Sequence, residues 1–422
     1  MTRSPIAMLA IAAVLLAAAP RAASAQQSGP PLSTDERRCA GLSATPPDAQ
    51  AASCTVLLNS GRYVGDNLAI VHANRGIAYA RAGDYDRAIA EFDTALRVNP
   101  SYTRAYISRG NALLVKRDFE RAIASFDQAI RFDPRAAASF MGRATAYDAK
   151  GELDRALADY DAALRLDPNM AAAYFNRGLM LRRRGLSDRA IADYDQALRL
   201  NPRDVAAYNN RGIALADKGE HDRAIADYDA ALKLDPNYGL AYLNRGLSWN
   251  AKKDAERALT DFEAAVRLAP DSASAYGHRG TALQLKGDTD RAIADLDKAI
   301  ALDPRNASYF GSRGNAWRNR GRLDRALADY DQAIALTPNN WLAYYDRAQT
   351  HYLLGNFREA LADAGKTAEL NANWAPAISL RGLIQEKLGA KDAAIADLRR
   401  AAALDPAFQQ PADALRRLGI MR

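Results

Sequence analysis

One phrase of the sequence returns at a fixed interval of 34 residues, and this period is the strongest constraint on the fold. Residues 188–202 read DRAIADYDQALRLNP, and residues 222–236 read DRAIADYDAALKLDP. Nine prolines from Pro100 to Pro406 lie on the same grid, which only Ala372 interrupts. A period of this length is typical of supersecondary units that stack on their neighbours. The sequence therefore predicts ten repeats over residues 69–408.

Each repeat is predicted to form two helices joined by a short turn. In the fourth repeat the first helix carries one apolar and small-residue stripe with helical spacing, formed by Tyr174, Arg177, Gly178 and Leu181. The stripe of its second helix comprises Ala190, Tyr194, Ala197 and Leu198. Gly185 marks the turn, and Gly takes that place in eight of the ten repeats. Pro202 ends the second helix because proline cannot continue it.

This spacing resembles the tetratricopeptide repeat (TPR). The residues that carry the resemblance are an aromatic, then Gly, then Ala, aromatic, Ala and Pro at the positions quoted above. The repeats that contain them cover about four-fifths of the chain. The resemblance implies an all-α fold, a right-handed α-solenoid of about ten helix-turn-helix repeats. One departure is systematic, because the family usually has Leu just before the Gly and this chain has Arg every time.

The first residues of the sequence have the pattern of a targeting segment. Arg3 precedes an apolar run from Ile6 to Ala19, and Ala23 and Ala25 form an A-x-A cleavage pattern. Such a pattern predicts a secretory signal peptide over residues 1–25, a mature chain that begins at Gln26, and a periplasmic or secreted location. An uncleaved membrane anchor is the alternative. No later apolar stretch is long enough for a membrane helix, so no stable membrane insertion is expected.

The segments that flank the repeats are predicted to cap them, because a stacked repeat cannot bury its outer face alone. Residues 26–34 are expected to be a flexible linker, residues 35–68 an N-terminal cap, and residues 409–422 a C-terminal capping helix. The only two cysteines, Cys39 and Cys54, lie in the N-terminal cap. Export to an oxidising compartment predicts that they form a disulfide. Two free thiols are the alternative.

The arginine that precedes the Gly forms what we call the arginine row. Its members are Arg75, Arg109, Arg143, Arg177, Arg211, Arg245, Arg279, Arg313, Arg347 and Arg381. Sixteen residues after each stands a member of what we call the first acid row: Glu91, Ser125, Asp159, Asp193, Asp227, Asp261, Asp295, Asp329, Asp363 and Asp397. Nine of these ten are acidic, which predicts bidentate pairs within each repeat, such as Arg177–Asp193 and Arg211–Asp227. A phosphate or nucleic-acid site is the less favoured alternative.

No constellation of catalytic residues emerges from the sequence. The four His occupy four different places in the repeat, without the spacing of metal ligands. There is no Gly-x-Ser-x-Gly motif and no phosphate-cradling glycine-rich loop. Asp-x-Asp pairs recur in nearly every repeat, so they are expected to be surface and pairing residues rather than catalytic dyads. The sequence predicts neither enzymatic activity nor a metal or cofactor.

Resemblance to the TPR family also implies that the first helices line a concave groove that binds extended peptides. One repeat place, just before the arginine row, carries Asn74, Asn176, Asn210 and Asn244. Related long arrays use an asparagine ladder at this place to hold a peptide backbone, which an amide can do because it donates and accepts. Four further residues are expected in the same groove: Asn111, Asn315, Arg104 and Arg182. The alternative is that these side chains merely face water.

Two clusters of arginines suggest a partner with acidic segments. They are Arg182, Arg183 and Arg184 in the fourth repeat, and Arg318, Arg320 and Arg322 in the eighth. A solvated charged face is the alternative explanation. Nucleic acid is not expected as a partner, because the signal peptide directs the chain away from it.

Taken together, these features predict a non-catalytic scaffold of the bacterial envelope that binds a protein or peptide in its groove. The bacterial envelope is implied by resemblance to exported arrays of this kind. One alternative is a carrier or assembly factor for envelope polysaccharide, for which Phe175 and Tyr345 are the candidate sugar-stacking rings. An enzyme is the least favoured alternative.

Overall fold

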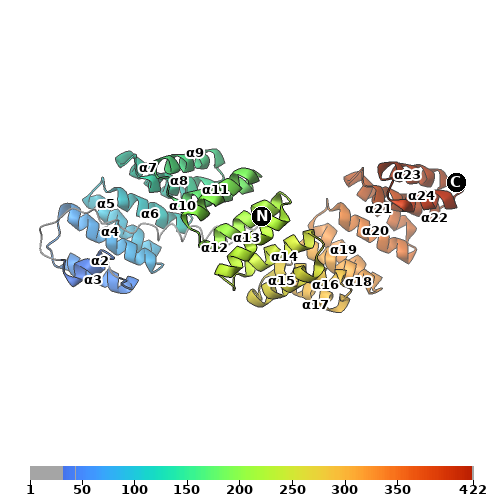
Figure 1. The fold of residues 1–422 in the computed structure, drawn as a ribbon, viewed down its shortest axis with the longest axis horizontal. Helices are drawn as coiled ribbons and strands as arrows, with labels where there is room; N and C mark the ends of the chain where they lie inside the picture. Colours follow the sequence, from blue (N-terminus) through green and yellow to red (C-terminus); the bar gives the residue numbers. More distant parts are fainter. Residues whose placement is uncertain (1–31, 43, 421–422) are drawn as a thin grey trace. The chain divides into compact units, whose positions relative to one another are not determined.

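The computed structural model describes residues 32–420, apart from residue 43. Over these residues the chain forms 23 α-helices and no strand (Figure 1). The chain divides into two compact units, Met1–Glu220 and His221–Arg422. The signal peptide expected over residues 1–25 and most of the linker expected over residues 26–34 lie outside the described residues.

Both units consist of helices of similar length in an unbroken succession. The helices of the first unit are α2 (Thr34–Cys39), α3 (Pro47–Asn59), α4 (Gly65–Arg81), α5 (Tyr85–Val98), α6 (Thr103–Val115), α7 (Phe119–Phe132), α8 (Ala137–Lys150), α9 (Leu153–Leu166), α10 (Ala171–Arg183), α11 (Ser187–Leu200) and α12 (Val205–Asp217). Those of the second unit are α13 (His221–Leu234), α14 (Gly239–Ala251), α15 (Ala255–Leu268), α16 (Ala273–Leu285), α17 (Thr289–Leu302), α18 (Ala307–Asn319), α19 (Leu323–Leu336), α20 (Trp341–Leu354), α21 (Phe357–Leu370), α22 (Ala375–Lys387), α23 (Lys391–Leu404) and α24 (Gln409–Arg417).

Within each unit the helices pack in the order of the sequence. The most extensive contacts join the two helices of one repeat, such as α4 with α5 or α16 with α17. Each second helix also packs against the first helix of the next repeat, as α7 does against α8. First helices of neighbouring repeats touch as well, for example α6 and α8. This stacking of helix pairs confirms the predicted all-α repeat fold.

Small residues permit the close packing of the two helices in a repeat. A Cβ atom on Gly178 would lie 2.8 Å from Cε1 of Tyr194, closer than two carbon atoms can approach. Tyr194 and Ala190 are fully buried beside it. The aromatic ring of the second helix therefore occupies the space that a side chain on the first helix would need, which explains why the Gly recurs.

The turns between paired helices use a left-handed backbone conformation. Gly185 has φ 74°, and most repeats place a Gly with positive φ at this point. The two repeats without it place Arg117 and Lys253 there, at φ 63° and 64°. Positive φ costs a residue with a Cβ about 1 kcal/mol or more, so these two turns are the strained exceptions.

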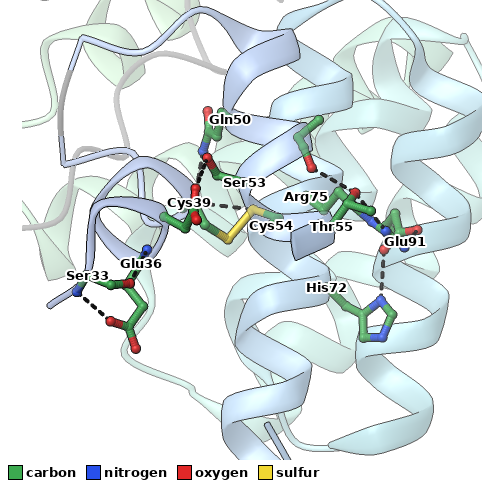
Figure 2. The surroundings of a disulfide bond; sticks show 12 residues. Ser33, Glu36, Cys39, Gln50, Ser53, Cys54, Thr55, His72, Arg75 and Glu91 are labelled. Carbon is green, nitrogen blue, oxygen red and sulfur yellow. Dashed lines mark hydrogen bonds and ion pairs between the residues drawn. A yellow bond between two sulfur atoms is a disulfide. The ribbon is translucent and has the colours of Figure 1, made fainter. Parts of the chain in front are cut away.

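The N-terminal cap is closed by the expected disulfide between Cys39 of α2 and Cys54 of α3, whose Cα atoms lie 4.8 Å apart (Figure 2). Both sulfurs belong to buried side chains. Ser33 caps α2, so the helix begins at Thr34, inside the segment expected to be linker. Tyr63 donates a hydrogen bond to Glu36 of α2 over 2.7 Å. This bond and those from Ser33 lower the pKa of Glu36 to about 2.

At the C-terminus, α24 packs against α22 and α23. Its residues Ala414 and Leu415 are each 1% exposed, so the helix covers the apolar side of the last repeat. Arg417 of α24 also pairs with Glu386 of α22 over 2.6 Å. The cap thus combines apolar cover on one side with charge on the other.

Candidate functional site

The arginine row is held by carboxylates on two sides, first within its own repeat. Arg177 donates through Nε and Nη2 to both carboxylate oxygens of Asp193, over 2.7 and 2.6 Å. The predicted Arg177–Asp193 pair is therefore present, and it is bidentate. The same contact, at 2.6–2.9 Å, forms in six further pairs: Arg143–Asp159, Arg245–Asp261, Arg279–Asp295, Arg313–Asp329, Arg347–Asp363 and Arg381–Asp397.

Seven of the ten guanidinium groups also reach back to the preceding repeat. The residues two positions after the first acid row form what we call the second acid row: Asp93, Asp127, Asp161, Asp195, Asp229, Glu263, Asp297 and Asp331, followed by Gly365 and Arg399 in the last two repeats. Arg177 donates through Nη1 to Asp161 over 2.6 Å. Six further arginines make this contact at 2.5–2.7 Å: Arg109, Arg143, Arg211, Arg245, Arg313 and Arg347.

The Asp-x-Asp pairs therefore bind two different arginines. Asp159 binds Arg143 of its own repeat, and Asp161 binds Arg177 of the next one. A ladder of ion pairs thus connects successive repeats within each unit. Sequence reasoning expected only the contact inside the repeat. The second contact was not predicted because it joins residues of different repeats.

Aromatic rings complete the surroundings of this ladder. The guanidinium of Arg177 stacks over Tyr174, 5.6 Å from the ring centroid, and seven other members of the arginine row lie over the equivalent ring. The hydrogen bonds that Arg143 donates to Asp159 raise the pKa of Arg143 above its ordinary value. Where an arginine of the row binds both carboxylates, the guanidinium N–H groups that a phosphate ligand would need are already used. The ladder is therefore structural.

Two repeats depart from the bidentate pattern. Arg75 makes a single contact to Glu91 over 2.7 Å, because Glu91 also binds His72 over 2.8 Å (Figure 2). Arg109 meets the neutral Ser125, to which its Nε donates over 3.1 Å.

The two residues of one predicted pair, Arg211 and Asp227, belong to different units of the chain. Arg211 contacts Asp195 within the first unit, over 2.6 Å. Its predicted partner Asp227 belongs to the second unit, so the Arg211–Asp227 pair stays a prediction.

The asparagines predicted to line a groove are more buried than expected. Asn74, Asn176 and Asn210 are 7%, 6% and 1% exposed, and Asn244 is half-buried. The alternative that these side chains merely face water is therefore wrong for the first three, whereas the expectation that they line a peptide-binding groove stays a prediction. Neighbouring first helices, such as α4 and α6, pack against each other. This packing leaves side chains at this place little access to water.

Four of these amides have unmet hydrogen-bonding capacity. Asn74 and Asn176 make no side-chain hydrogen bond with any residue that the structure describes. The Oδ1 atoms of Asn111 and Asn210 are buried and accept no hydrogen bond. Only Nδ2 of Asn210 is used, by donation to the backbone oxygen of Ala206 over 2.9 Å. We call Asn74, Asn111, Asn176 and Asn210 the unmet asparagines, and all four lie on first helices of the first unit.

A buried amide without a partner is unfavourable by about 1–3 kcal/mol relative to one that is hydrogen-bonded. Oδ1 of Asn111 and Oδ1 of Asn210 are two such buried atoms, and Asn74 and Asn176 add two amides that no described residue binds. A ligand with backbone N–H and C=O groups could satisfy them. This makes the unmet asparagines the strongest candidate site in the chain.

In the eighth repeat, Asn315 occupies the place that Asn111 has in the second repeat, and both of its polar atoms are hydrogen-bonded within the chain. Tyr330 donates to Oδ1 of Asn315 over 2.8 Å, and Nδ2 of Asn315 donates to Asp346 over 3.3 Å. Arg318 donates to the same carboxylate over 3.1 Å and to Gln349 over 3.0 Å. Burial raises the pKa of Asp346, and Arg318 offsets part of that rise. Both polar atoms of Asn315 therefore have a partner within the chain, whereas Oδ1 of Asn111, at the same place in the second repeat, has none.

All six clustered arginines also have carboxylate partners. The pairs are Arg182–Asp217, Arg183–Asp148, Arg184–Asp154, Arg318–Asp346, Arg320–Asp290 and Arg322–Asp324. The two clusters are therefore largely neutralised, which weakens the expectation of an acidic partner segment there. Nε of Arg182 remains buried without a partner. Arg104 is half-buried near Tyr102, whose pKa burial raises.

Sequence reasoning missed two features of the first helices. Gly142 takes the asparagine place in the third repeat, where a Cβ would lie 2.4 Å from the ring of Phe126. The Phe126 ring therefore leaves no room for an asparagine side chain at this place in the third repeat. In the second unit, Trp374 meets Trp341 and Tyr345 edge to face, with both pairs of ring centroids 4.6 Å apart. The available signal in the sequence was the pair Trp341 and Trp374, which are the first and last residues of the ninth repeat.

Comparison with known proteins agrees with the repeat pattern. Family models described as "Tetratricopeptide repeat" match residues 74–137, 141–204, 181–239, 210–273, 251–307 and 375–408. A further model described as "TPR repeat" matches residues 314–355. No curated protein sequence matches the chain.

Solved structures are also similar to this chain. The crystal structure of the APC/C hetero-tetramer Cut9-Hcn1 has a TM-score of 0.52 at 16% identity, over 90% of this chain and 86% of that chain, a likeness of fold alone. YrrB, "a TPR protein with an unusual peptide-binding site", is 28% identical over 44% of this chain and 95% of its own, with a TM-score of 0.39. A tetratricopeptide repeat protein from Parabacteroides merdae ATCC 43184 is 22% identical over 59% of this chain and 98% of its own, with a TM-score of 0.48.

Proposed function

Because the chain belongs to the tetratricopeptide-repeat family, whose repeats form protein-interaction scaffolds, we propose that it binds an extended segment of a partner protein along the first helices of its first unit. The observation that carries this proposal is the set of unmet asparagines. The backbone of an extended peptide offers donors and acceptors at regular intervals, which buried amides can bind. Proteins of this fold typically act without catalysis, and we propose the same here.

Substituting the unmet asparagines separates binding from stability. Asn74→Ala and Asn176→Ala, singly and together, are expected to weaken peptide binding by about 1–3 kcal/mol in the double variant, or about 5- to 150-fold, because each removes one or two hydrogen bonds. The melting temperature should stay the same or rise, since an unpartnered buried amide does not stabilise the fold. Peptides selected from a phage-displayed random library against the immobilised protein are the probe, with affinity measured by fluorescence anisotropy.

A matched control is available in the loop that precedes α10. Asn169 is exposed, and its replacement by alanine should change neither affinity nor melting temperature. If the Asn74/Asn176 double variant binds the selected peptides as tightly as the unchanged protein, the first-helix site is wrong. A melting temperature that falls together with affinity would assign these asparagines to the fold instead.

We further propose that the protein is exported and acts in the bacterial envelope. The signal peptide pattern of residues 1–25 and the disulfide Cys39–Cys54 support this location. None of the described helices is long and apolar enough to cross a membrane.

Export predicts a defined mature protein. When the full chain is produced in a bacterium with a periplasm, the soluble periplasmic fraction should contain a form that begins at Gln26 and lacks free thiols. Intact-mass measurement with and without alkylation, under non-reducing conditions, checks both points. Retention of Met1 would rule out cleavage, and two alkylated cysteines without prior reduction would contradict an oxidising destination.

The polysaccharide alternative has one supporting observation, the ring cluster of Trp341, Tyr345 and Trp374. Its rings meet edge to face and are half-buried, so they offer each other the contacts that a sugar would need. Phe175, the other candidate ring, packs against Tyr194 with centroids 5.9 Å apart. A protein partner therefore remains the better-supported proposal.

A further inference from the structure

Among the nine repeats that follow another repeat, the ion-pair ladder has one arginine, Arg381, without its second carboxylate and without any acid in that place. Seven members of the arginine row donate through Nη1 to a second-row Asp over 2.5–2.7 Å. The residue of the second acid row that precedes Arg381 by 16 positions is Gly365, which has no carboxylate. Arg381 keeps both contacts to Asp397, each of 2.7 Å. Its Nη1 makes no hydrogen bond with any described residue, and its side chain is 26% exposed, against 18–23% for the rest of the row.

Arg279 is the instructive comparison. Its second-row residue is Glu263, which pairs with Arg291 over 3.4 Å instead. Glu263 nevertheless stands close enough to contribute to the raised pKa of Arg279. For Arg381, Asp397 is the one carboxylate that raises the pKa. Arg381 therefore differs from Arg279 because no second acid is near it.

The surroundings of Gly365 leave room for a ligand. A Cβ built on Gly365 would meet no atom within 4 Å. The residue lies inside α21 and has no positive φ, so no turn or close helix contact requires a glycine there. Glycine inside a helix is unfavourable by about 1 kcal/mol relative to alanine. In the last repeat the same row carries Arg399, which is exposed and has no partner among the described residues. The row of acids thus ends in a neutral and then a positive residue.

We propose that Nη1 of Arg381 and the open space at Gly365 form a docking point for an aspartate or glutamate side chain of a partner protein. The incoming carboxylate would make the contact that Asp331 makes with Arg347 one repeat earlier, at 2.6 Å. Asp397 already fixes the guanidinium, so little conformational entropy is lost when the carboxylate binds. This docking point lies in the second unit and does not depend on the unmet asparagines of the first.

Nitrogen-15 NMR of arginine side chains can follow this site directly. In protein with ¹⁵N-labelled arginine, the Nε–H signal of Arg381 is assigned by its loss in Arg381→Lys. The probe is an N-acetylated, C-amidated tri-glutamate peptide. The Arg381 signal is expected to shift saturably, while the signals of Arg313 and Arg347, whose Nη1 atoms are bound, stay in place. Gly365→Asp should fill the site and weaken the peptide affinity at Arg381 at least about fivefold, as expected for loss of a charge-assisted hydrogen bond.

Gly365→Asn is the matched control, because it has the same shape without the charge and should keep the affinity within about twofold. Three results would overturn the proposal. They are equal affinities for the Asp and Asn variants, an equal response to an uncharged N-acetylated, C-amidated tri-glutamine peptide, and a shift of the Arg381 signal by sodium phosphate at lower concentrations than by the tri-glutamate peptide. None of these results bears on the asparagine site, whose own test uses the selected peptides.

Discussion

Replacing Arg177 by leucine is expected to destabilise the first unit by about 3–5 kcal/mol. The change leaves Asp193, whose side chain is 7% exposed, as a buried carboxylate without its partner. It also releases Asp161 of the preceding repeat. Chemical denaturation followed by far-UV circular dichroism measures the loss. Because stacked repeats can unfold in parts, the total signal and its midpoint are compared rather than a single two-state fit.

The ladder itself supplies the controls for this prediction. Arg177→Leu combined with Asp193→Leu should recover much of the stability, since no buried charge is then left unpaired. Arg109→Leu should cost less than Arg177→Leu, because its partners are the neutral Ser125 and Asp93, which is 44% exposed. If the single losses at Arg177 and Asp193 simply add in the double variant, the two residues do not act as a pair.

Removing the disulfide is expected to cost about 3 kcal/mol in the chain-entropy model for a loop of 15 residues. The loss should concentrate in α2, α3 and the adjoining α4. Three hydrogen bonds remain to hold α2 after reduction: Tyr63 to Glu36, Ser53 to Asp35, and Gln50 to the backbone oxygen of Cys39. The cap should therefore loosen rather than dissociate.

Amide hydrogen exchange with and without a reducing agent measures this effect along the chain. Exchange should accelerate in α2, α3 and the start of the first repeat, because a terminal repeat depends on its cap. Helices of the second unit should exchange at unchanged rates. A Cys39→Ala/Cys54→Ala protein should not respond to the reducing agent. Uniform acceleration along the whole chain, or none, would contradict a local role for the disulfide.

The ladder also explains why this chain departs from the family at the arginine row. Leucine at this place would pack against apolar neighbours, whereas Arg177 links Asp193 of its own repeat to Asp161 of the repeat before it. Directional contacts of this kind fix how one repeat sits on the next, even where their net contribution to stability is small. A repeated array with a defined register can present a set of amides at fixed places, which is what the proposed peptide site needs.

The sequence alone determined the helices, the turns and the pairing inside one repeat. These features depend on residues close in the chain, such as Gly178 opposite Tyr194 and the Arg177–Asp193 pair 16 residues apart. A strict period makes such local signals reinforce one another ten times. The disulfide was predictable for a different reason, because the chain has two cysteines and an N-terminal sequence pattern that predicts export.

Only the tertiary structure decided which side chains are free to bind a partner. Asn111 and Asn315 occupy the same place in their repeats, yet Oδ1 of Asn111 is buried without a partner and Asn315 is held between Tyr330 and Asp346. Arg347 and Arg381 occupy the same place in their repeats, yet only Arg347 has a carboxylate at Nη1. Whether a polar group is satisfied depends on the residues that the neighbouring repeats bring against it. Those contacts cross from one repeat to the next, so the pattern within a single repeat cannot specify them.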